Sequence, residues 1–189
     1  LWASFAASAA SCVDVSSALQ PDGHFVLDAA RLAAVHGATL PEGVQSLRLV
    51  AEDAAGNRSP TVTIDFTLDT TAPAAPGLDL LAASDSGVRD DDELTRDATP
   101  TLRLTAEDGS AIVLRRDGDP TQWSLTGPSA EFTSPPLADG TQIFRATATD
   151  LAGNVGETAT LALSIDTEAP ALVHLGLDPA SDTGAVGDL

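Results

Sequence analysis

The sequence has almost no cysteine: Cys12 is the only one among 189 residues. An internal disulfide is therefore impossible, which excludes the small secreted domains that depend on disulfide networks. Tyrosine and methionine are absent, and aromatic residues make up only 4% of the chain, although hydrophobic residues reach 43%. The core must therefore consist mainly of alanine, leucine and valine, which is feasible at this length.

Basic residues are scarce. Nine Lys and Arg stand against 28 Asp and Glu, and the formal net charge is -19. Such a chain repels nucleic acid and anionic membrane surfaces, so neither is expected as a partner. No apolar run approaches the roughly 20 residues that cross a bilayer, so membrane insertion is not expected. The segment Leu1 to Phe5 lacks the features of a signal peptide, and we expect the chain to be an interior segment.

Catalytic motifs are also lacking. The histidines His24, His36 and His174 show no HxxxH or HExxH spacing for zinc, and Cys12 has no evident basic partner in the sequence. We therefore expect a protein that is not an enzyme.

An internal repeat dominates what is present. Residues 40–74 match residues 137–171 at an offset of 97, with 16 of 35 positions identical and no gap. The same offset carries the SDSG sequence that starts at Ser84 onto the SDTG sequence that starts at Ser181. The chain therefore divides into an N-terminally incomplete repeat (1–74), a complete repeat (75–171), and the start of a third repeat or a linker (172–189).

Extending this register to the N-terminus pairs Leu1 with Ala98. The first repeat is thus expected to lack its opening strand and its own acidic loop. Residues 27–38 depart from the pattern, because their spacing and composition predict a short helix.

Alternation with period two predicts half-buried strands in both repeats. Further strands are expected at residues 102–106, 111–115 and 123–126, and the Gly-Asn pairs that end at Asn57 and Asn154 predict tight hairpins. Short strands in a repeat of roughly 100 residues predict an all-β fold of tandem immunoglobulin-like β-sandwiches, antiparallel and of Greek-key type. The apolar faces of the alternating strands are Phe144, Ala146 and Ala148; Leu161, Leu163 and Ile165; and, in the first repeat, Val62, Ile64, Phe66 and Leu68.

Several motifs resemble the bacterial Ig-like repeats of large secreted and surface adhesin-type proteins. They are ATATDLAGN at 146–154, the strand exits DTEAP at 166–170 and DTTAP at 69–73, and the SDSG and SDTG loops. The resemblance implies a stiff string of sandwiches, exported by a bacterium and often rigidified by calcium near domain junctions. Members of this family serve as spacers, adhesive stalks or accessory modules.

The acidic loop after Ser84 is the candidate metal site. Calcium takes six to eight oxygen ligands in flexible geometry, and clustered carboxylates with backbone carbonyls provide them. The alternative is a solvated acidic loop that binds nothing tightly. The candidate Ca²⁺ ligands are Asp69, Asp85, Asp90, Asp91, Asp92, Asp166, Asp182 and Asp188.

Two of these candidates have an alternative role. Asp69 and Asp166 precede Ala-Pro at the end of each repeat, where they either bind calcium or only end the strand. A long opening strand would place the acidic loop beside Asp166, and a short one would place it near Asp69. Asp150 and Asn154, like Asp53 and Asn57, are expected to form turns rather than to bind metal.

The sequence thus favours a structural or adhesive repeat of an extracellular or cell-surface bacterial protein, acting as a spacer rod stiffened by calcium. Its partners would be the neighbouring repeats of the same chain. The alternative is a ligand-binding or assembly module that recognises a glycan, a matrix or a partner protein. An exposed aromatic patch present on only one repeat would favour this alternative.

Overall fold

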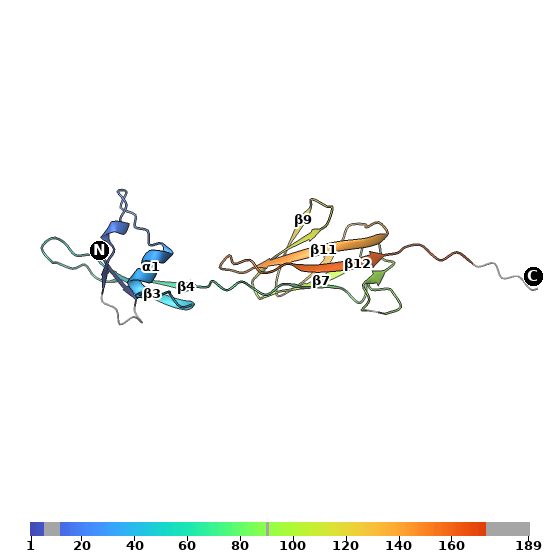
Figure 1. Ribbon diagram of the computed structural model, residues 1–189, viewed down its shortest axis with the longest axis horizontal. Coiled ribbons are helices and arrows are strands. Elements are labelled where there is room, and N and C mark those ends of the chain that lie inside the picture. The colour runs from blue at the N-terminus through green and yellow to red at the C-terminus, as the bar shows by residue number, and fades with distance from the viewer. Residues whose placement is uncertain (6–11, 90, 173–189) are drawn as a thin grey trace, which may run out of the picture.

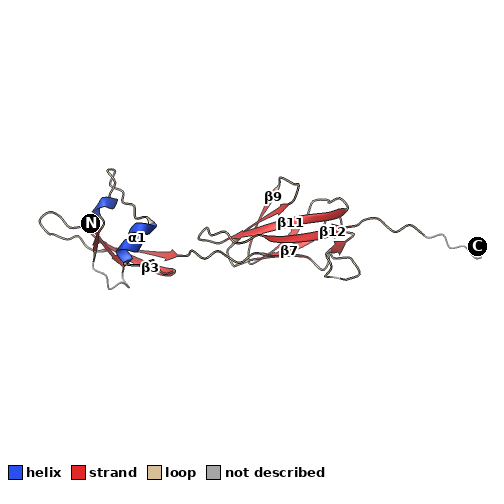
Figure 2. Cartoon of the chain, in the orientation of Figure 1, coloured by secondary structure: helices blue, strands red, loops and turns tan. Residues whose placement is uncertain are grey.

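The computed structural model describes residues 1–5, 12–89 and 91–172. Two units follow one another along the long axis of the molecule (Figure 1). Strands dominate both units, and the helices lie in the first (Figure 2).

The first unit contains a single four-stranded sheet in the order β2-β1-β3-β4, in which all neighbours are antiparallel. Its elements are β1 (Trp2–Phe5), β2 (Val13–Asp14), the 3-10 helix η1 (Ser16–Ala18), α1 (Ala29–His36), β3 (Gly43–Val50) and β4 (Val62–Leu68).

The second unit contains two sheets, ordered β10-β7-β5 and β6-β12-β11-β8-β9. All neighbours are antiparallel except β6 and β12, which run parallel. Its strands are β5 (Gly77–Leu80), β6 (Leu94–Thr95), β7 (Thr101–Thr105), β8 (Ala111–Arg116), β9 (Gln122–Thr126), β10 (Ser129–Thr133), β11 (Gly140–Thr149) and β12 (Ala159–Ile165).

The core of the second unit consists of the faces that alternation predicted. Phe144 on β11 and Leu163 on β12 are completely buried, as are Leu102 and Leu104 on β7 in the other sheet. These side chains belong to one apolar cluster. Burial of one face of each sheet against the other confirms the predicted sandwich for the complete repeat.

The first unit keeps only one of these two sheets. Phe5 on β1 lies opposite Leu47 on β3, and Arg116 on β8 lies opposite Phe144 on β11. Leu47 and Phe144 are counterparts in the repeat, so Phe5 corresponds to Arg116. Strands β2-β1-β3-β4 therefore take the places of β9-β8-β11-β12. In the described part of residues 1–74, no strand takes the place of β5, β6, β7 or β10.

The gapless register was therefore wrong before residue 40. At an offset of 97 residues, the counterpart of Arg116 would be Leu19, but Phe5 occupies that place, 14 residues earlier. Extra residues between β1 and β3 account for the shift, and they include α1. Within the described residues, the first unit therefore has one sheet where the second has two, so the two units differ by more than the opening strand.

Helix α1 packs against the sheet of the first unit, and it confirms the predicted helix. It begins after Asp28, whose side chain accepts a hydrogen bond from the backbone N–H of Arg31 at 2.8 Å, and ends at Gly37, whose φ is 83°. Val35 is buried, and the ring of His36 lies edge-on to Phe5, with centroids 5.4 Å apart. The helix thus covers β1 and the adjacent part of β3.

The N-terminal half of β4 remains uncovered, and there the predicted burial was wrong. Val62 is 58% exposed and Ile64 is 44% exposed, whereas Leu161, the counterpart of Ile64 on β12, is 8% exposed. The alternation is present in both strands, but only β12 has a second sheet to pack against. Burial of a strand face depends on such a partner as well as on the pattern.

Candidate metal site and repeat junction

The acidic loop between β5 and β6 contains a buried carboxylate. Asp85 is only 8% exposed, and its Oδ2 accepts a hydrogen bond from the backbone N–H of Glu93 at 3.3 Å. Its Oδ1 is buried and has no hydrogen-bond partner among the residues that the structure describes. An unpaired buried carboxylate oxygen costs free energy, and a bound cation would remove that cost.

Further oxygens lie around Gly87 in the same loop. A Cβ atom at Gly87 would come within 2.7 Å of Asp92 Oδ1 and within 3.1 Å of the Leu94 carbonyl oxygen. A side chain at this position would have to displace the Asp92 carboxylate. Carboxylate and carbonyl oxygens are the ligands that calcium takes in proteins, so the oxygens around Gly87 are of the type that the ion binds.

The neighbouring acid, Asp91, is bound differently. Its carboxylate forms an ion pair with Arg89 at 2.9 Å, and the hydrogen bond from Arg89 to Asp91 raises the pKa of the guanidinium. A metal ion would have to compete with Arg89 for this carboxylate. Asp90, Asp182 and Asp188 lie outside the described residues.

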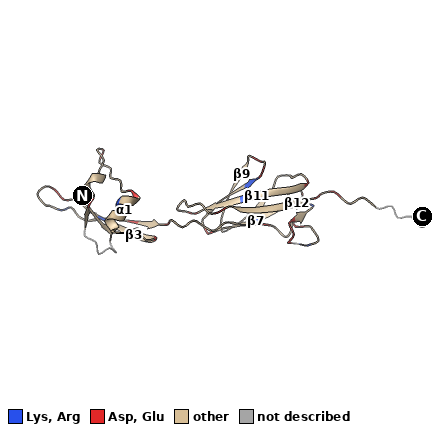
Figure 3. Ribbon diagram, in the orientation of Figure 1, with Lys and Arg blue, Asp and Glu red and all other residues tan. Residues whose placement is uncertain are grey.

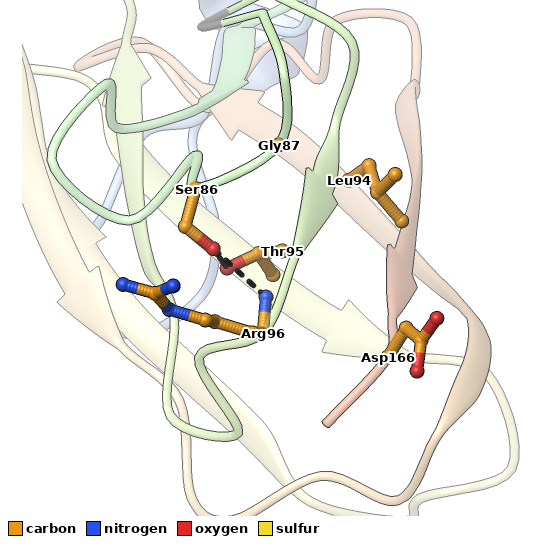
Figure 4. A pocket seen from close by; sticks show the side chains of 6 residues that line it. All are labelled: Ser86, Gly87, Leu94, Thr95, Arg96 and Asp166. Atoms are coloured by element: carbon orange, nitrogen blue, oxygen red, sulfur yellow. Dashed lines mark hydrogen bonds between the residues drawn. The ribbon is translucent and has the colours of Figure 1, made fainter. Parts of the chain in front are cut away.

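The loop lies beside Asp166 of its own repeat although the opening strand β5 has only 4 residues, so the expectation that a short opening strand would leave the loop near Asp69 was wrong. Asp166 lines the same cavity of about 150 Å³ as Ser86, Gly87 and Leu94 (Figure 4). The parallel pairing of β6 with β12 fixes this arrangement, because it brings Leu94 opposite Ser164. Within residues 1–5, 12–89 and 91–172, however, no three acidic, histidine or cysteine side chains gather closely enough to hold a metal ion.

Asp69 and Asp166, which follow the last strand of each repeat, both stabilise local turns. Asp69 Oδ1 accepts a hydrogen bond from the N–H of Thr71, and Asp166 Oδ1 accepts one from the N–H of Glu168, each at 3.1 Å. This geometry is that of a residue that ends a strand. It leaves the other carboxylate oxygen of each residue for a further ligand.

A second acidic residue, which was not predicted from the sequence, binds the chain just after the last strand of each repeat. Glu42 accepts hydrogen bonds from the N–H of Thr70 at 3.0 Å and from its hydroxyl, and Asp139 accepts the equivalent pair from Thr167 at 3.2 and 2.9 Å. The hydrogen bonds from Thr70 and Thr71 lower the pKa of Glu42. The signal was present, because Glu42 and Asp139 align in the repeat.

The hairpin acids form turns, as expected. Asp150 accepts hydrogen bonds from the side-chain amide and backbone N–H of Asn154, both at 2.8 Å, and Asp53 does the same with Asn57, both at 2.9 Å. The side-chain hydrogen bond from the asparagine lowers the pKa of each aspartate. The carboxylates are therefore already used within the hairpins.

The second hairpin also contacts the linker between the units. Asn154 Nδ2 donates to the carbonyl oxygen of Asp69 at 3.2 Å. A Cβ atom at Gly156 would lie 2.4 Å from the carbonyl oxygen of Pro73, so a side chain there would displace the linker. The residue at the equivalent position of the first repeat is Ser59, which instead accepts a hydrogen bond from the N–H of Ala51 at 3.0 Å.

The remaining charged and polar groups are dispersed. Figure 3 shows acidic residues in loops, including the loop between β5 and β6. His24 pairs with Asp22 at 3.4 Å, Cys12 is exposed, and His174 lies outside the described residues. No helix in the described part of the chain has the length and apolar character needed to cross a bilayer.

Several solved structures are similar to this chain. They include a PKD domain of an M14-like peptidase from Thermoplasmatales archaeon SCGC AB-540-F20, with 16% identity, a TM-score of 0.39, and coverage of 50% of this chain and 96% of that one. Fibronectin(III)-like modules of Clostridium thermocellum CbhA show 16% identity and a TM-score of 0.36, with coverage of 74% and 71%.

A Ca²⁺-stabilized adhesin of an Antarctic bacterium that binds ice shows 23% identity and a TM-score of 0.35, with coverage of 75% of this chain but only 34% of the adhesin. No curated protein matches the sequence. The model of a family described as "Bacterial Ig-like domain" matches residues 71–167, which span the whole sandwich of the second unit and slightly more than half of the sequence. The chain therefore belongs to the bacterial Ig-like domain family.

Proposed function

We propose that this chain is a non-enzymatic spacer segment of an extracellular or cell-surface bacterial protein, in which successive repeats are held in a fixed direction and calcium stiffens the rod. Its partners are the neighbouring repeats of the same chain. The net charge of -19 supports the expectation that nucleic acid and anionic membranes are not partners.

The contact between the linker and the second repeat carries this proposal. A flexible tether would leave the linker free of both units, whereas Gly156 and Asn154 lie directly against its backbone. The linker also contains Ala-Pro-Ala-Ala-Pro at residues 72–76, and proline restricts its backbone further. Both features favour a fixed direction between the units.

Replacing Gly156 by serine is expected to loosen this junction. The new Cβ would occupy the space beside the Pro73 carbonyl, so the linker has to move away. Spin labels on Cys12 and on a Ser124→Cys variant would report the distance between the units, since both positions are exposed. We expect the distribution of distances measured by pulsed electron paramagnetic resonance to broaden.

The matched control is Ser59→Gly, which makes the reverse exchange at the equivalent position of the first hairpin, where it should leave the distance distribution unchanged. An unaltered distribution in Gly156→Ser would show that the linker contact does not hold the two units in place.

The buried Oδ1 atom of Asp85 supports calcium binding in the acidic loop. Extracellular calcium modules bind with dissociation constants of about 10⁻⁴ to 10⁻³ M. At 10 mM calcium, such a site would stabilise the second repeat by about 1.4 to 2.7 kcal/mol. Thermal unfolding with and without calcium measures this gain.

Asp85→Asn should abolish the gain, because it removes the buried charge and replaces one carboxylate oxygen by an amide nitrogen, which is no calcium ligand. Asp108→Asn is the control, since Asp108 is an exposed acid in the β7–β8 loop and its substitution removes the same charge. A gain that survives in Asp85→Asn, or no gain in the parent at 10 mM calcium, would contradict the calcium site.

A further inference from the structure

Strand β9 (Gln122–Thr126) ends the five-stranded sheet of the second repeat, and no strand in the described part of the chain pairs with its outer edge. Figure 1 shows it at the margin of the second unit. The other strands that end a sheet in this unit are protected, because β5 and β10 contain Asp79 and Glu131 and β6 has only 2 residues. Strand β9 has 5 residues and no charge, so its exposed edge lacks this protection against pairing.

The hydrogen bonds between β8 and β9 determine which backbone groups of β9 point outward. The N–H of Gly127 donates to the carbonyl oxygen of Ser110 at 2.9 Å, so this pair and every second pair along the two strands are hydrogen-bonded. Trp123 and Leu125 belong to these pairs. The N–H and C=O groups that point away from β8 belong to the other residues of β9, whose side chains are all exposed. These residues are Gln122, Ser124 and Thr126.

The outward-pointing groups are arranged symmetrically about Ser124. When a second β9 runs antiparallel beside the first, with Ser124 opposite Ser124, each Gln122 lies opposite a Thr126. Outward-pointing groups then meet outward-pointing groups at every position. On the core side of the sheet, Trp123 of one copy lies opposite Leu125 of the other. Both side chains are only partly buried at the margin of the core, so each copy covers apolar surface of the other.

We propose that two copies of this chain associate through their β9 edges, in an antiparallel arrangement that extends one sheet through both copies. The contact is isologous, since the same edge serves both copies, and it is complete in a pair. One strand edge buries a small area, so the association is weak. The proposal goes beyond the role of a spacer, because the two rods of such a pair point in opposite directions, as rods from two facing surfaces do.

Sedimentation equilibrium of the full chain tests the proposal. The average mass should rise with concentration from 19.2 kDa towards that of two chains and no further. Ser124→Pro should remain monomeric, because it removes the N–H at the centre of the contact. Proline is tolerated where the N–H of an edge strand faces solvent, so the pairing of β9 with β8 should persist.

Two charge variants at the same two positions give the sharper result. Gln122→Glu/Thr126→Lys places opposite charges across the contact, whereas Gln122→Glu/Thr126→Glu places like charges there. We expect their association constants to differ by about tenfold or more at low salt, with the parent between them, and the difference to shrink as salt is added. Val88→Glu/Leu151→Glu is the matched control. It adds two negative charges at exposed positions outside β9 and should associate as the parent does.

Three results would overturn the proposal. They are a parent that stays monomeric up to millimolar concentration, a Ser124→Pro variant that associates as the parent does, and two charge variants that associate equally. Thermal unfolding of Ser124→Pro checks that the second repeat is folded. If it is not, the two charge variants still decide the question, because both substituted positions are exposed.

The same contact affects the spin-label measurement of the junction, because Ser124 lies at its centre. The labelled Ser124→Cys chain is therefore mixed with an excess of unlabelled chains, which leaves only distances within one copy.

Discussion

Phe144→Ala is expected to destabilise the second repeat by about 3 to 5 kcal/mol, the usual cost of deleting a buried phenylalanine. Phe144 is completely buried between the two sheets, so its truncation leaves a cavity in the middle of this core. Urea unfolding followed by the fluorescence of Trp123, which packs against the same core, measures the loss in this repeat.

Ile143→Ala is the control for this experiment. Ile143 precedes Phe144 on β11 but faces the other side of the sheet and is only partly buried, so its substitution should cost far less. Equal losses for the two variants would mean that the sandwich core does not lie where the structure places it.

Leu161→Ala and Ile64→Ala are expected to differ strongly, although the two residues are counterparts in the repeat. Leu161 is 8% exposed and its truncation should cost about 2 to 5 kcal/mol, whereas Ile64 is 44% exposed and its truncation should cost less than about 1 kcal/mol. The second sheet that covers β12 has no equivalent over β4. Urea unfolding at low protein concentration, with the transition of each repeat followed separately, measures both losses.

A large loss in Ile64→Ala would show that part of the chain covers the side of β4 on which Ile64 lies.

Sequence periodicity predicted three strands of the complete repeat within one residue of their bounds. The predicted segments 102–106, 111–115 and 123–126 correspond to β7, β8 and β9. The alternation of Phe144, Ala146 and Ala148 also identified the buried face correctly. Such patterns are local, so a single strand carries them whatever surrounds it.

Burial in the first repeat was not predictable in the same way. Val62 and Ile64 retain the pattern of a buried face, but whether the face is covered depends on strands that are distant in sequence. The shift of β1 was also hidden, because residues 1–39 lack the motifs that fix the register from residue 40 onward. A gapless alignment carries no sign of an insertion that lies outside the matching region.

The candidate site was predicted in composition but not in geometry. The clustering of Asp85, Asp91 and Asp92 was visible, yet only the structure distinguishes the buried Asp85 from Asp91, which pairs with Arg89. The role of Glu42 and Asp139 at the strand exits also required the fold. Each acid is separated from its threonine by 28 residues, and pairing of the last two strands brings them together.

The parallel pairing of β6 with β12 determines how the second repeat carries tension. A pull on the C-terminal end of this repeat acts along β12 and draws it past its parallel neighbour β6 along their common axis. The hydrogen bonds from Ser164 to Glu93 and from Asp166 to Thr95 run across that direction, so both are loaded in shear at the same moment. The strands cannot unzip one bond at a time, and the repeat resists extension at its C-terminal end, where the next repeat would pull.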